Sequence, residues 1–422
     1  MIGRILNTFG TRSLSAVINL LIAVMVSQYL GPEGKGSQGI IITTVAFILV
    51  FSNLVGGATL VYLVPRHRYS LLLLPSYMWA LATGITAYLF LSISGVVDRE
   101  FILHICLLSV VNAFTNIHAG MLIGREKIRE SNLISLLQPL IVILSLAIYF
   151  MLMDKLTIGA YINALYFAFS GSLLLSLVYM GKSFDRMMLH TAQEYLATSR
   201  EMFRLGFMNQ AAHITQMMSF RLSYYFLEMY HGSASVGIYS NGIQLMESVW
   251  LISKSISLVQ YARISNTTDR AYAQDLTAQM FKAGFFISLL CILPLVLVPG
   301  QFYLLIFGPG FLGVKEVILV LAPGVLIYNF SIILGHYFSG TGRYHVNTIA
   351  SVAGLAVSLA LFITLIPPFG GMGAGIATSL SYAVTSLVVL VFFLRDGVKA
   401  TAFLPSAADI RILKQLTGKM KF

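Results

Sequence analysis

The sequence predicts an all-α membrane protein with about twelve transmembrane helices, in two pseudo-symmetric six-helix lobes around a central cavity. The 422-residue chain is 57% hydrophobic and only 10% charged, with a mean hydropathy of +0.83, whereas soluble domains are about 25% charged. Its apolar runs reach the roughly 20 residues that a helix needs to cross a bilayer. The two halves of the chain also repeat a pattern of glycines.

The expected spans follow one another along the whole chain, separated by short polar loops. Strands of a β-barrel would alternate over only about ten residues, so the long apolar runs favour helices. The first span lacks a cleavage site of small residues and is expected to remain as an anchor. The predicted spans centre on residues 10–30, 37–64, 71–95, 101–123, 133–153, 157–180, 205–230, 237–262, 276–299, 314–339, 346–366 and 372–394.

These spans divide the chain into two lobes. The predicted units are an N-terminal lobe over 1–182, a cytoplasmic linker over 183–204, a C-terminal lobe over 205–395 and a basic tail over 396–422. The linker contains FDRMMLHTAQEYLATSR and the tail contains IRILKQLTGKMKF. Each is expected either to lie on the membrane surface as an amphipathic segment or to act as a solvated tether.

Positive charge predicts the orientation. Of the 27 Lys and Arg residues, those outside the spans lie mostly on the side of the two termini; the other side holds only Lys35, Arg99, Lys155 and Lys315. Because cytoplasmic loops are enriched in Lys and Arg, both termini are expected to be cytoplasmic. The net charge of +11 is thus attributed to topology and not to nucleic-acid binding, which needs a basic face with interleaved aromatic residues.

The glycine-rich run GPEGKGS at 31–37 superficially resembles a phosphate-binding loop. Such a loop requires G-x-x-x-x-G-K-[ST], but here Tyr29 stands at the leading glycine and Gly36 at the hydroxyl position. A second candidate, GKS at 181–183, has Ser176 in place of the first glycine. The run is therefore interpreted as a tight turn on the outer side, and no ATP or other cofactor is expected.

Internal repetition supports the two lobes. YLGPEGKG at 29–36 aligns with YHGSASVG at 230–237, and each follows the first span of its half. The pairs Gly124-Arg125 and Gly342-Arg343 end the fourth span of each half. Repeats related by a pseudo-two-fold axis are common in transporters and place the substrate between the halves.

At these residues the chain resembles the Wzx-type polysaccharide flippases of the multidrug/oligosaccharidyl-lipid/polysaccharide exporter superfamily. The similar segments are RSLSAVINLLIAVMVSQYLGPEGKG at 12–36, GMLIGREK at 120–127 and RLSYYFLEMYHGSASVGIYSNGIQLMESV at 221–249. The resemblance implies a transporter and not an enzyme. It implies movement of undecaprenyl-diphosphate-linked oligosaccharide, such as O-antigen, from the cytoplasmic to the outer leaflet of a bacterial inner membrane by alternating access.

The resemblance also implies partners, and the chain departs from many of its relatives in one feature. Its partners would be the lipid-linked oligosaccharide, membrane lipids, an H⁺ or Na⁺ counter-ion, a polysaccharide polymerase and a chain-length regulator. Many relatives carry an acidic residue shortly after the Arg of span seven, where this chain has Leu222-Ser223-Tyr224. The acidic role then falls to Glu228 or Glu247, which are the candidates for ion coupling.

Polar residues collect on single faces of spans one, seven and eight, at 100° per residue. A charge at mid-membrane costs at least ~2.5–3.5 kcal/mol on insertion scales, so it usually faces a wet cavity or a partner. On span eight, Glu247 and Lys254 share a face beside a ridge of Asn241, Ser248 and Ser255. The other faces comprise Gln210, His213, Met217, Arg221, Tyr224 and Glu228 on span seven, and Thr8, Thr11, Arg12, Ser15 and Asn19 on span one.

In the resembling family, spans one, two, seven and eight line the cavity, which implies a cationic site for a lipid diphosphate. Arg suits such a site because its planar fork binds phosphate oxygens in pairs. The predicted substrate-binding residues are Arg12, Asn19, Gln210, Arg221, Tyr224 and Lys254, with Tyr225 and Tyr239 as further candidates for stacking on sugars. Two simpler interpretations stay open: Arg221 pairs with Glu228 or Glu247 only to hold helices together, and Arg12 extends to the head groups.

The remaining candidates have structural interpretations. Cys106 and Cys291 lie in apolar runs and are expected to pack there. No HExxH pair occurs, so no metal site is predicted, and the histidines at 104, 118, 213 and 336 are expected to be hydrogen-bonded core residues. Pro294 and Pro323 are expected to bend spans nine and ten, as hinges or as static kinks.

Two alternatives to a flippase remain. A multidrug and toxin extrusion-type ion antiporter would share the fold, but cationic drugs favour an acidic cavity, and the predicted one holds three cations against two carboxylates. A membrane glycan polymerase or ligase would typically carry a long external loop with catalytic polar residues. The sequence has no such loop and no catalytic triad.

Overall fold

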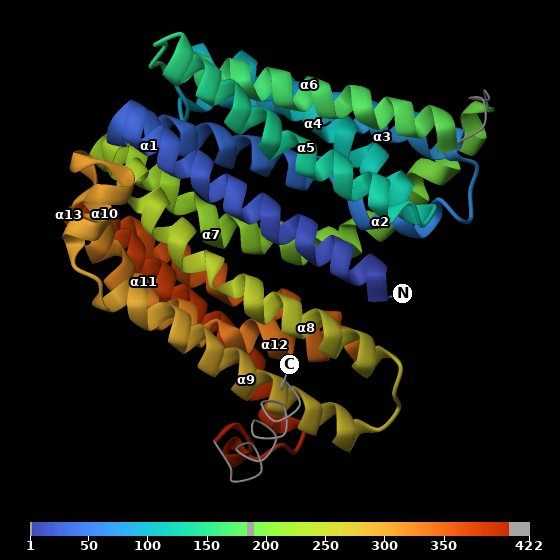
Figure 1. Cartoon of the computed structure of the whole chain (residues 1–422). Helices are drawn as coiled ribbons and strands as arrows, with labels where there is room; N and C mark the ends of the chain where they lie inside the picture. Colours follow the sequence, from blue (N-terminus) through green and yellow to red (C-terminus); the bar gives the residue numbers. More distant parts are fainter. Residues whose placement is uncertain (1, 184–189, 405–422) are drawn as a thin grey trace, which may run out of the picture.

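The computed structural model describes residues 2–183 and 190–404, and its regular structure over these ranges is helical (Figure 1). The first half contains α1 (Ile2–Ser52), α2 (Gly57–Leu63), α3 (Tyr69–Ser94), α4 (Arg99–Gly124), α5 (Ile128–Ala147) with a π-helical turn (Ile148–Leu152), and α6 (Ile158–Ser183). The second half contains α7 (Ala192–Ser248), α8 (Trp250–Ser265), α9 (Arg270–Leu297), α10 (Gly300–Phe307), a 3₁₀ turn (Pro309–Phe311), α11 (Val314–Ile327), α12 (Asn329–Gly340), α13 (Tyr344–Arg395) and a final 3₁₀ turn (Ala400–Phe403).

The three longest helices each contain a glycine where the helix is interrupted. Gly31, Gly232 and Gly370 have φ of 67°, 72° and 51°, which glycine adopts without the strain that a side chain would cause. An uninterrupted α7 of 57 residues would be about 85 Å long, roughly twice the thickness of a bilayer. Each of these helices therefore supplies two spans.

Within the described residues, eight helices are long and apolar enough to cross a membrane, counting α1 with α2 as one and α11 with α12 as one. α7 is more polar than the helices of that set, and α8 has only 16 residues. All twelve predicted spans lie on helices of the structure. The predicted all-α, multi-pass membrane fold is confirmed.

The glycine turns of α1 and α7 pack against each other. A Cβ added to Gly36 would lie 1.8 Å from the carbonyl oxygen of Ser233, and one added to Gly237 would lie 2.1 Å from that of Pro32. In the sequence repeat, Gly36 aligns with Gly237 and Pro32 aligns with Ser233. The two contacts are therefore the same contact made twice, as a two-fold axis requires.

The hydrophobic core joins the halves at the end of the glycine turns. One cluster combines residues of both halves, such as Ile22, Ile41, Tyr239 and Tyr382. Toward the other end, one separate cluster belongs to the first half and the beginning of α7, and another belongs to α8–α13. Accordingly, the halves meet at the left of Figure 1 and diverge toward the side where α1 begins.

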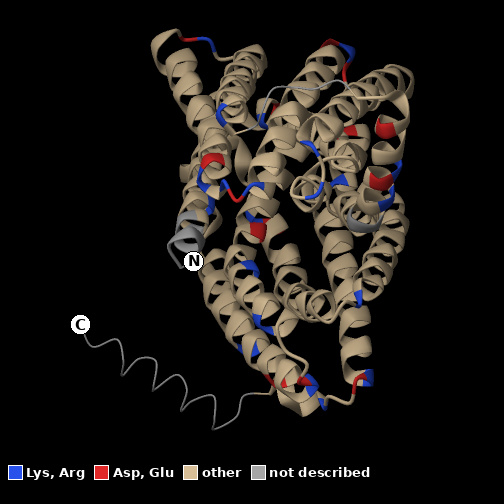
Figure 2. Ribbon diagram, turned by 90° about the vertical axis from the view of Figure 1, so that its right-hand side faces the viewer, with Lys and Arg blue, Asp and Glu red and all other residues tan. Residues whose placement is uncertain are grey.

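The diverging end carries most of the loop charges that predicted the orientation. Figure 2 looks onto this end, with Lys and Arg in blue. The turns here contain Arg66, Arg68, Arg125, Lys127 and Arg343, whereas Lys155 lies in a turn at the other end. The alternation of loops between two ends that the sequence predicts therefore matches the helix order.

The run GPEGKGS, predicted to be a tight turn, is helical except at one residue. Only Gly31 departs from helical geometry, and the helix resumes at Pro32, whose fixed φ suits a first turn. Lys35 is buried, and its Nζ donates a hydrogen bond to Gln38 Oε1 at 2.6 Å. The close packing of Gly36 against Ser233 draws this segment into the contact between the halves, which explains why it is not an exposed loop.

The predicted linker is partly helical. Thr191 Oγ1 accepts a hydrogen bond from Glu194 N at 3.3 Å, and Glu194 Oε2 accepts one from Thr191 N at 2.8 Å; this is a capping box. It starts α7 at Ala192, so residues 192–204 are continuous with span seven. Residues 184–189 and 405–422, on which the rest of the predicted surface segments fall, lie outside the described residues.

Three of the four histidines have the predicted hydrogen bonds. His104 pairs with Tyr166 OH at 3.0 Å, His118 with Ser176 Oγ at 2.6 Å and His336 with the carbonyl of Ile332 at 2.8 Å. His213 is exposed. Cys106 is buried and Cys291 half-buried, and both are free thiols.

Candidate functional site

An ion pair joins the two arms of α7. Because α7 is interrupted at Gly232, Arg221 on the first arm faces Glu247 on the second. Arg221 Nη1 donates to Glu247 Oε1 at 3.0 Å and Nη2 donates to Oε2 at 2.6 Å. Tyr382 of α13 donates to Glu247 Oε1 at 3.1 Å. The side chains of Arg221 and Glu247 remain 24% and 16% exposed, so the pair is accessible to a ligand.

This geometry identifies the partner of Arg221 as Glu247. The two parallel hydrogen bonds occupy the same fork of the guanidinium that would bind phosphate oxygens. Lys254 of α8 is exposed and interacts electrostatically with both members of the pair. We call Arg221, Glu247, Lys254 and Tyr382 the charged cluster. An anion entering it has to compete with Glu247 for Arg221.

Residues of α1 face this region from the other half of the molecule. The carbonyl of Asn19 accepts a hydrogen bond from Gln244 Nε2 at 3.2 Å, and Gln244 lies one turn from Glu247. Arg12 is two turns before Asn19, on the same face of α1, and both residues are exposed. The beginning of α1 and the whole of α8 lie toward the end where the halves diverge (Figure 1), and Arg12 and Lys254 belong to these segments.

Two predicted binding residues are instead part of the packed interior. Tyr224 is 6% exposed, and its ring centroid lies 5.7 Å from that of the fully buried Tyr239. Gln210 is 9% exposed and packs against Gly57 of α2. Stacking on a sugar requires an accessible ring, so Tyr224 and Tyr239 are not placed for it. Tyr225 donates or accepts a hydrogen bond with Thr44 at 2.8 Å.

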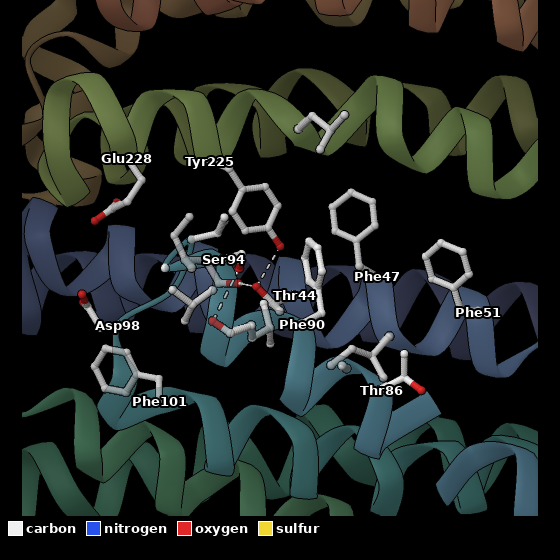
Figure 3. Close-up of a pocket in the computed structure, with 18 of the residues that line it drawn as sticks. Thr44, Phe47, Phe51, Thr86, Phe90, Ser94, Asp98, Phe101, Tyr225 and Glu228 are labelled. Carbon is white, nitrogen blue, oxygen red and sulfur yellow. Dashed lines mark hydrogen bonds between the residues drawn. The ribbon is translucent and has the colours of Figure 1, made fainter. Parts of the chain in front are cut away.

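Glu228 lies in a separate cavity of about 980 Å³, lined by the second arm of α1, α3, the start of α4, and α7 (Figure 3). Its Oε1 accepts a hydrogen bond from Ser233 at 2.6 Å. The carboxylate of Asp98 interacts with it electrostatically. We call this cavity the acidic groove. The two candidate carboxylates for ion coupling therefore belong to different sites.

Sequence reasoning missed Tyr382 and Asp98. Tyr382 is one of 21 tyrosines in an otherwise apolar span, so nothing marked it as a partner of Glu247. Asp98 lies in a short polar turn, where an acidic residue is ordinary. Reasoning also missed three serine hydroxyls, of Ser219, Ser358 and Ser381, which join α7 to both arms of α13 at 2.7–2.9 Å.

No metal site is apparent in the part of the chain that the structure describes. Within it, no group of three or more His, Cys, Asp or Glu side chains is arranged to hold an ion.

Comparison by sequence yields partial matches. No protein-family model matches the chain. The capsular polysaccharide biosynthesis protein CapF of Staphylococcus aureus is 28% identical over 173 residues, which are 40% of this chain and 43% of CapF. An uncharacterized membrane protein of Methanocaldococcus jannaschii is 29% identical over 132 residues, 30% of this chain and 26% of that protein. The matches thus span less than half the length of either relative.

Comparison by structure covers almost the whole chain. The lipid II flippase MurJ, in an inward closed conformation, is similar with a TM-score of 0.76 and 15% identity, over 98% of this chain and 93% of MurJ. An inward-facing multidrug resistance MATE family transporter of the MOP superfamily has a TM-score of 0.74 and 14% identity, over 90% of this chain and 94% of its own. The chain therefore has the two-lobe helical fold of the MATE and MurJ transporters of this superfamily.

Proposed function

We propose that the protein is a flippase that moves undecaprenyl-diphosphate-linked oligosaccharide from the cytoplasmic to the outer leaflet of a bacterial inner membrane. The observation that carries this proposal is the charged cluster, in which Arg221 and Lys254 accompany one carboxylate, with Arg12 exposed on the facing half. This excess of cations suits an anionic cargo. MurJ is by its name a lipid II flippase, and CapF is by its name a capsular polysaccharide biosynthesis protein.

Loading of the site is an exchange of anions at Arg221. The diphosphate oxygens accept hydrogen bonds from the guanidinium fork, and Glu247 is released from it. Lys254, which interacts electrostatically with Glu247, then remains as its counter-charge, or the carboxylate takes up H⁺ or Na⁺. Glu247 is therefore the stronger candidate for ion coupling, because Glu228 has no contact with Arg221.

The MATE neighbour keeps a multidrug extruder as the second candidate. The positive balance of the charged cluster disfavours cationic drugs at that position. A glycan polymerase or ligase has no support in the fold. A polysaccharide polymerase and a chain-length regulator remain proposed partners of the flippase.

The test uses the purified protein in proteoliposomes that contain a labelled polyprenyl-diphosphate oligosaccharide. A membrane-impermeant glycosidase reports the fraction of labelled lipid in the outer leaflet over time. We expect the wild type and a Lys155→Ala control, changed in an exposed turn, to equilibrate the lipid, and Arg221→Ala to fail. Extrusion of a cationic dye without movement of the lipid would reject the flippase and support the extruder.

A further inference from the structure

The acidic groove is long, mostly apolar and partly open. Its lining follows α1 from Ser37 to Phe51, a length of about 21 Å at 1.5 Å per residue. The groove is therefore longer than the hydrocarbon layer of one leaflet, which is about 15 Å thick. Phe90 of α3 lines the groove and is nevertheless 63% exposed. The groove is therefore open to a ligand beside α3.

The charge of the groove is confined to one end. Figure 3 shows the carboxylates of Glu228 and Asp98 on two different elements, both directed into the cavity. The second oxygen of Glu228 is buried without a hydrogen-bond partner among the described residues. Asp98 is the N-cap residue of α4, but its side chain accepts no capping hydrogen bond. Both carboxylates thus keep free acceptor positions.

Among the described residues, no basic side chain lines the groove, although the chain as a whole has a net charge of +11. Two like charges beside an apolar wall are unfavourable unless a counter-charge pairs with them. A diphosphate at this end would bring about two negative charges and no cation, which argues against the head group of the proposed cargo. A ligand that suits the groove is therefore a cation attached to a long apolar chain.

We propose that the acidic groove binds a phospholipid with an ethanolamine head group, at a site distinct from the charged cluster. The ammonium has three N–H donors for the Asp98 and Glu228 carboxylates. One acyl chain lies along the rings of Phe47, Phe90 and Phe226. The phosphate lies beside the first turn of α4, where backbone N–H groups that Asp98 leaves uncapped favour an anion.

In this arrangement the ammonium faces the two carboxylates and the phosphate faces the start of α4. A simple hydrophobic cation would make only the first of these two contacts. The groove takes its walls from α1 and α3 of the first half and from α7 of the second. A lipid in it contacts both halves, so its binding favours the arrangement of halves described here over one that separates these walls.

The test is native mass spectrometry of the purified full-length protein, titrated with phosphatidylethanolamine and with phosphatidylglycerol of identical acyl chains. We expect the wild type to retain the ethanolamine lipid about tenfold more strongly. Asp98→Asn combined with Glu228→Gln should abolish this preference. Glu100→Gln, which changes a neighbouring acid outside the lining, should preserve it, and Ala87→Trp, which fills the groove, should weaken the binding of both lipids.

The comparison of the two lipids on the wild type decides the proposal even if a variant fails to fold. Equal retention of both lipids, or an unchanged preference in the double variant, would overturn it. Stronger binding of dodecyltrimethylammonium than of the ethanolamine lipid would assign the groove to hydrophobic cations instead. Stronger binding of a polyprenyl diphosphate would assign it to the cargo.

Discussion

At the scale of single residues, the structural role of the ion pair between Arg221 and Glu247 can be measured. Removing one partner of a buried ion pair leaves the other charge unpaired and costs about 3–5 kcal/mol. Because both side chains are partly exposed, we expect Arg221→Ala to destabilise the protein by about 3 kcal/mol. Adding Glu247→Gln should restore most of that stability, because no unpaired charge remains. Thermal unfolding of the single and double variants in detergent measures the coupling; equal stability of Arg221→Ala and the wild type would exclude a structural role.

The same variants separate transport from packing. The double variant lacks the guanidinium, so we expect it to stay inactive in the flipping assay although it is stable. Arg221→Lys keeps the charge and loses the fork, and we expect its initial rate to fall about tenfold, less than for Arg221→Ala. Arg12→Ala and Lys254→Ala should show smaller losses. Wild-type rates in the double variant, at matched protein levels, would leave Arg221 with packing alone.

At the level of single residues, the sequence predicted which side chains share a helix face, because helical periodicity determines this. Periodicity predicted that Gln210, Arg221 and Tyr224 lie on one face of span seven. It does not state which neighbour covers each part of that face, and the structure covers Tyr224 with Tyr239 and Gln210 with α2. The pairing of Arg221 with Glu247 rather than Glu228 likewise depends on where α7 is interrupted.

At the scale of elements, the contact between the glycine turns of α1 and α7 leaves no room for a side chain. We expect Gly36→Ala to destabilise the protein by about 1–3 kcal/mol, because its Cβ would overlap the Ser233 carbonyl. Gly10→Ala is the matched control: no atom lies within 4 Å of its Cβ, and alanine favours a helix over glycine. Thermal unfolding of both variants measures the difference, and equal melting temperatures would show that the halves do not depend on this contact.

The elements themselves were the most predictable part of the fold. In lipid every backbone N–H and C=O has to be paired within the segment, so apolar runs of membrane length become helices. The run GPEGKGS shows the limit of this reasoning. Its turn at Gly31 was predictable from glycine and proline, but the close packing of Gly36 against Ser233, about 200 residues away in the chain, was not.

At the scale of the whole molecule, the distribution of Lys and Arg predicts which end of the fold faces the cytoplasm. Glu33 and Thr268 are exposed at opposite ends of the fold. They are therefore suitable positions for labelling from the two sides of the membrane. After replacement of Cys106 and Cys291, we expect an impermeant thiol reagent to label Glu33→Cys from outside and Thr268→Cys only from the cytoplasm. Labelling of Glu33→Cys only from the cytoplasm would invert the topology.

For the proposed flippase, the arrangement of cores corresponds to one state of the transport cycle. The halves share a core at the glycine-turn end and have separate cores at the other end. With the predicted orientation, the charged cluster is therefore approached from the cytoplasm. Export by alternating access then requires the contact of Gly36 with Ser233 and of Gly237 with Pro32 to open.

The energy for this cycle follows from the charges that move with the halves. Arg12, Arg221 and Lys254 against Glu247 leave the empty site with about two positive charges, and a diphosphate diester brings about two negative charges. The loaded site is then nearly neutral, and the empty site returns positive charge inward. Each charge gains ~2.3 kcal/mol per 100 mV, so an inside-negative potential favours the return by on the order of 5 kcal/mol. We therefore expect the potential to act mainly on resetting the empty carrier.

Proteoliposomes whose potential is clamped at zero with a potassium ionophore, while a proton or sodium gradient is kept, should show reduced steady-state transport. Undiminished initial and steady-state rates would contradict this scheme and leave ion exchange at Glu247 as the driver.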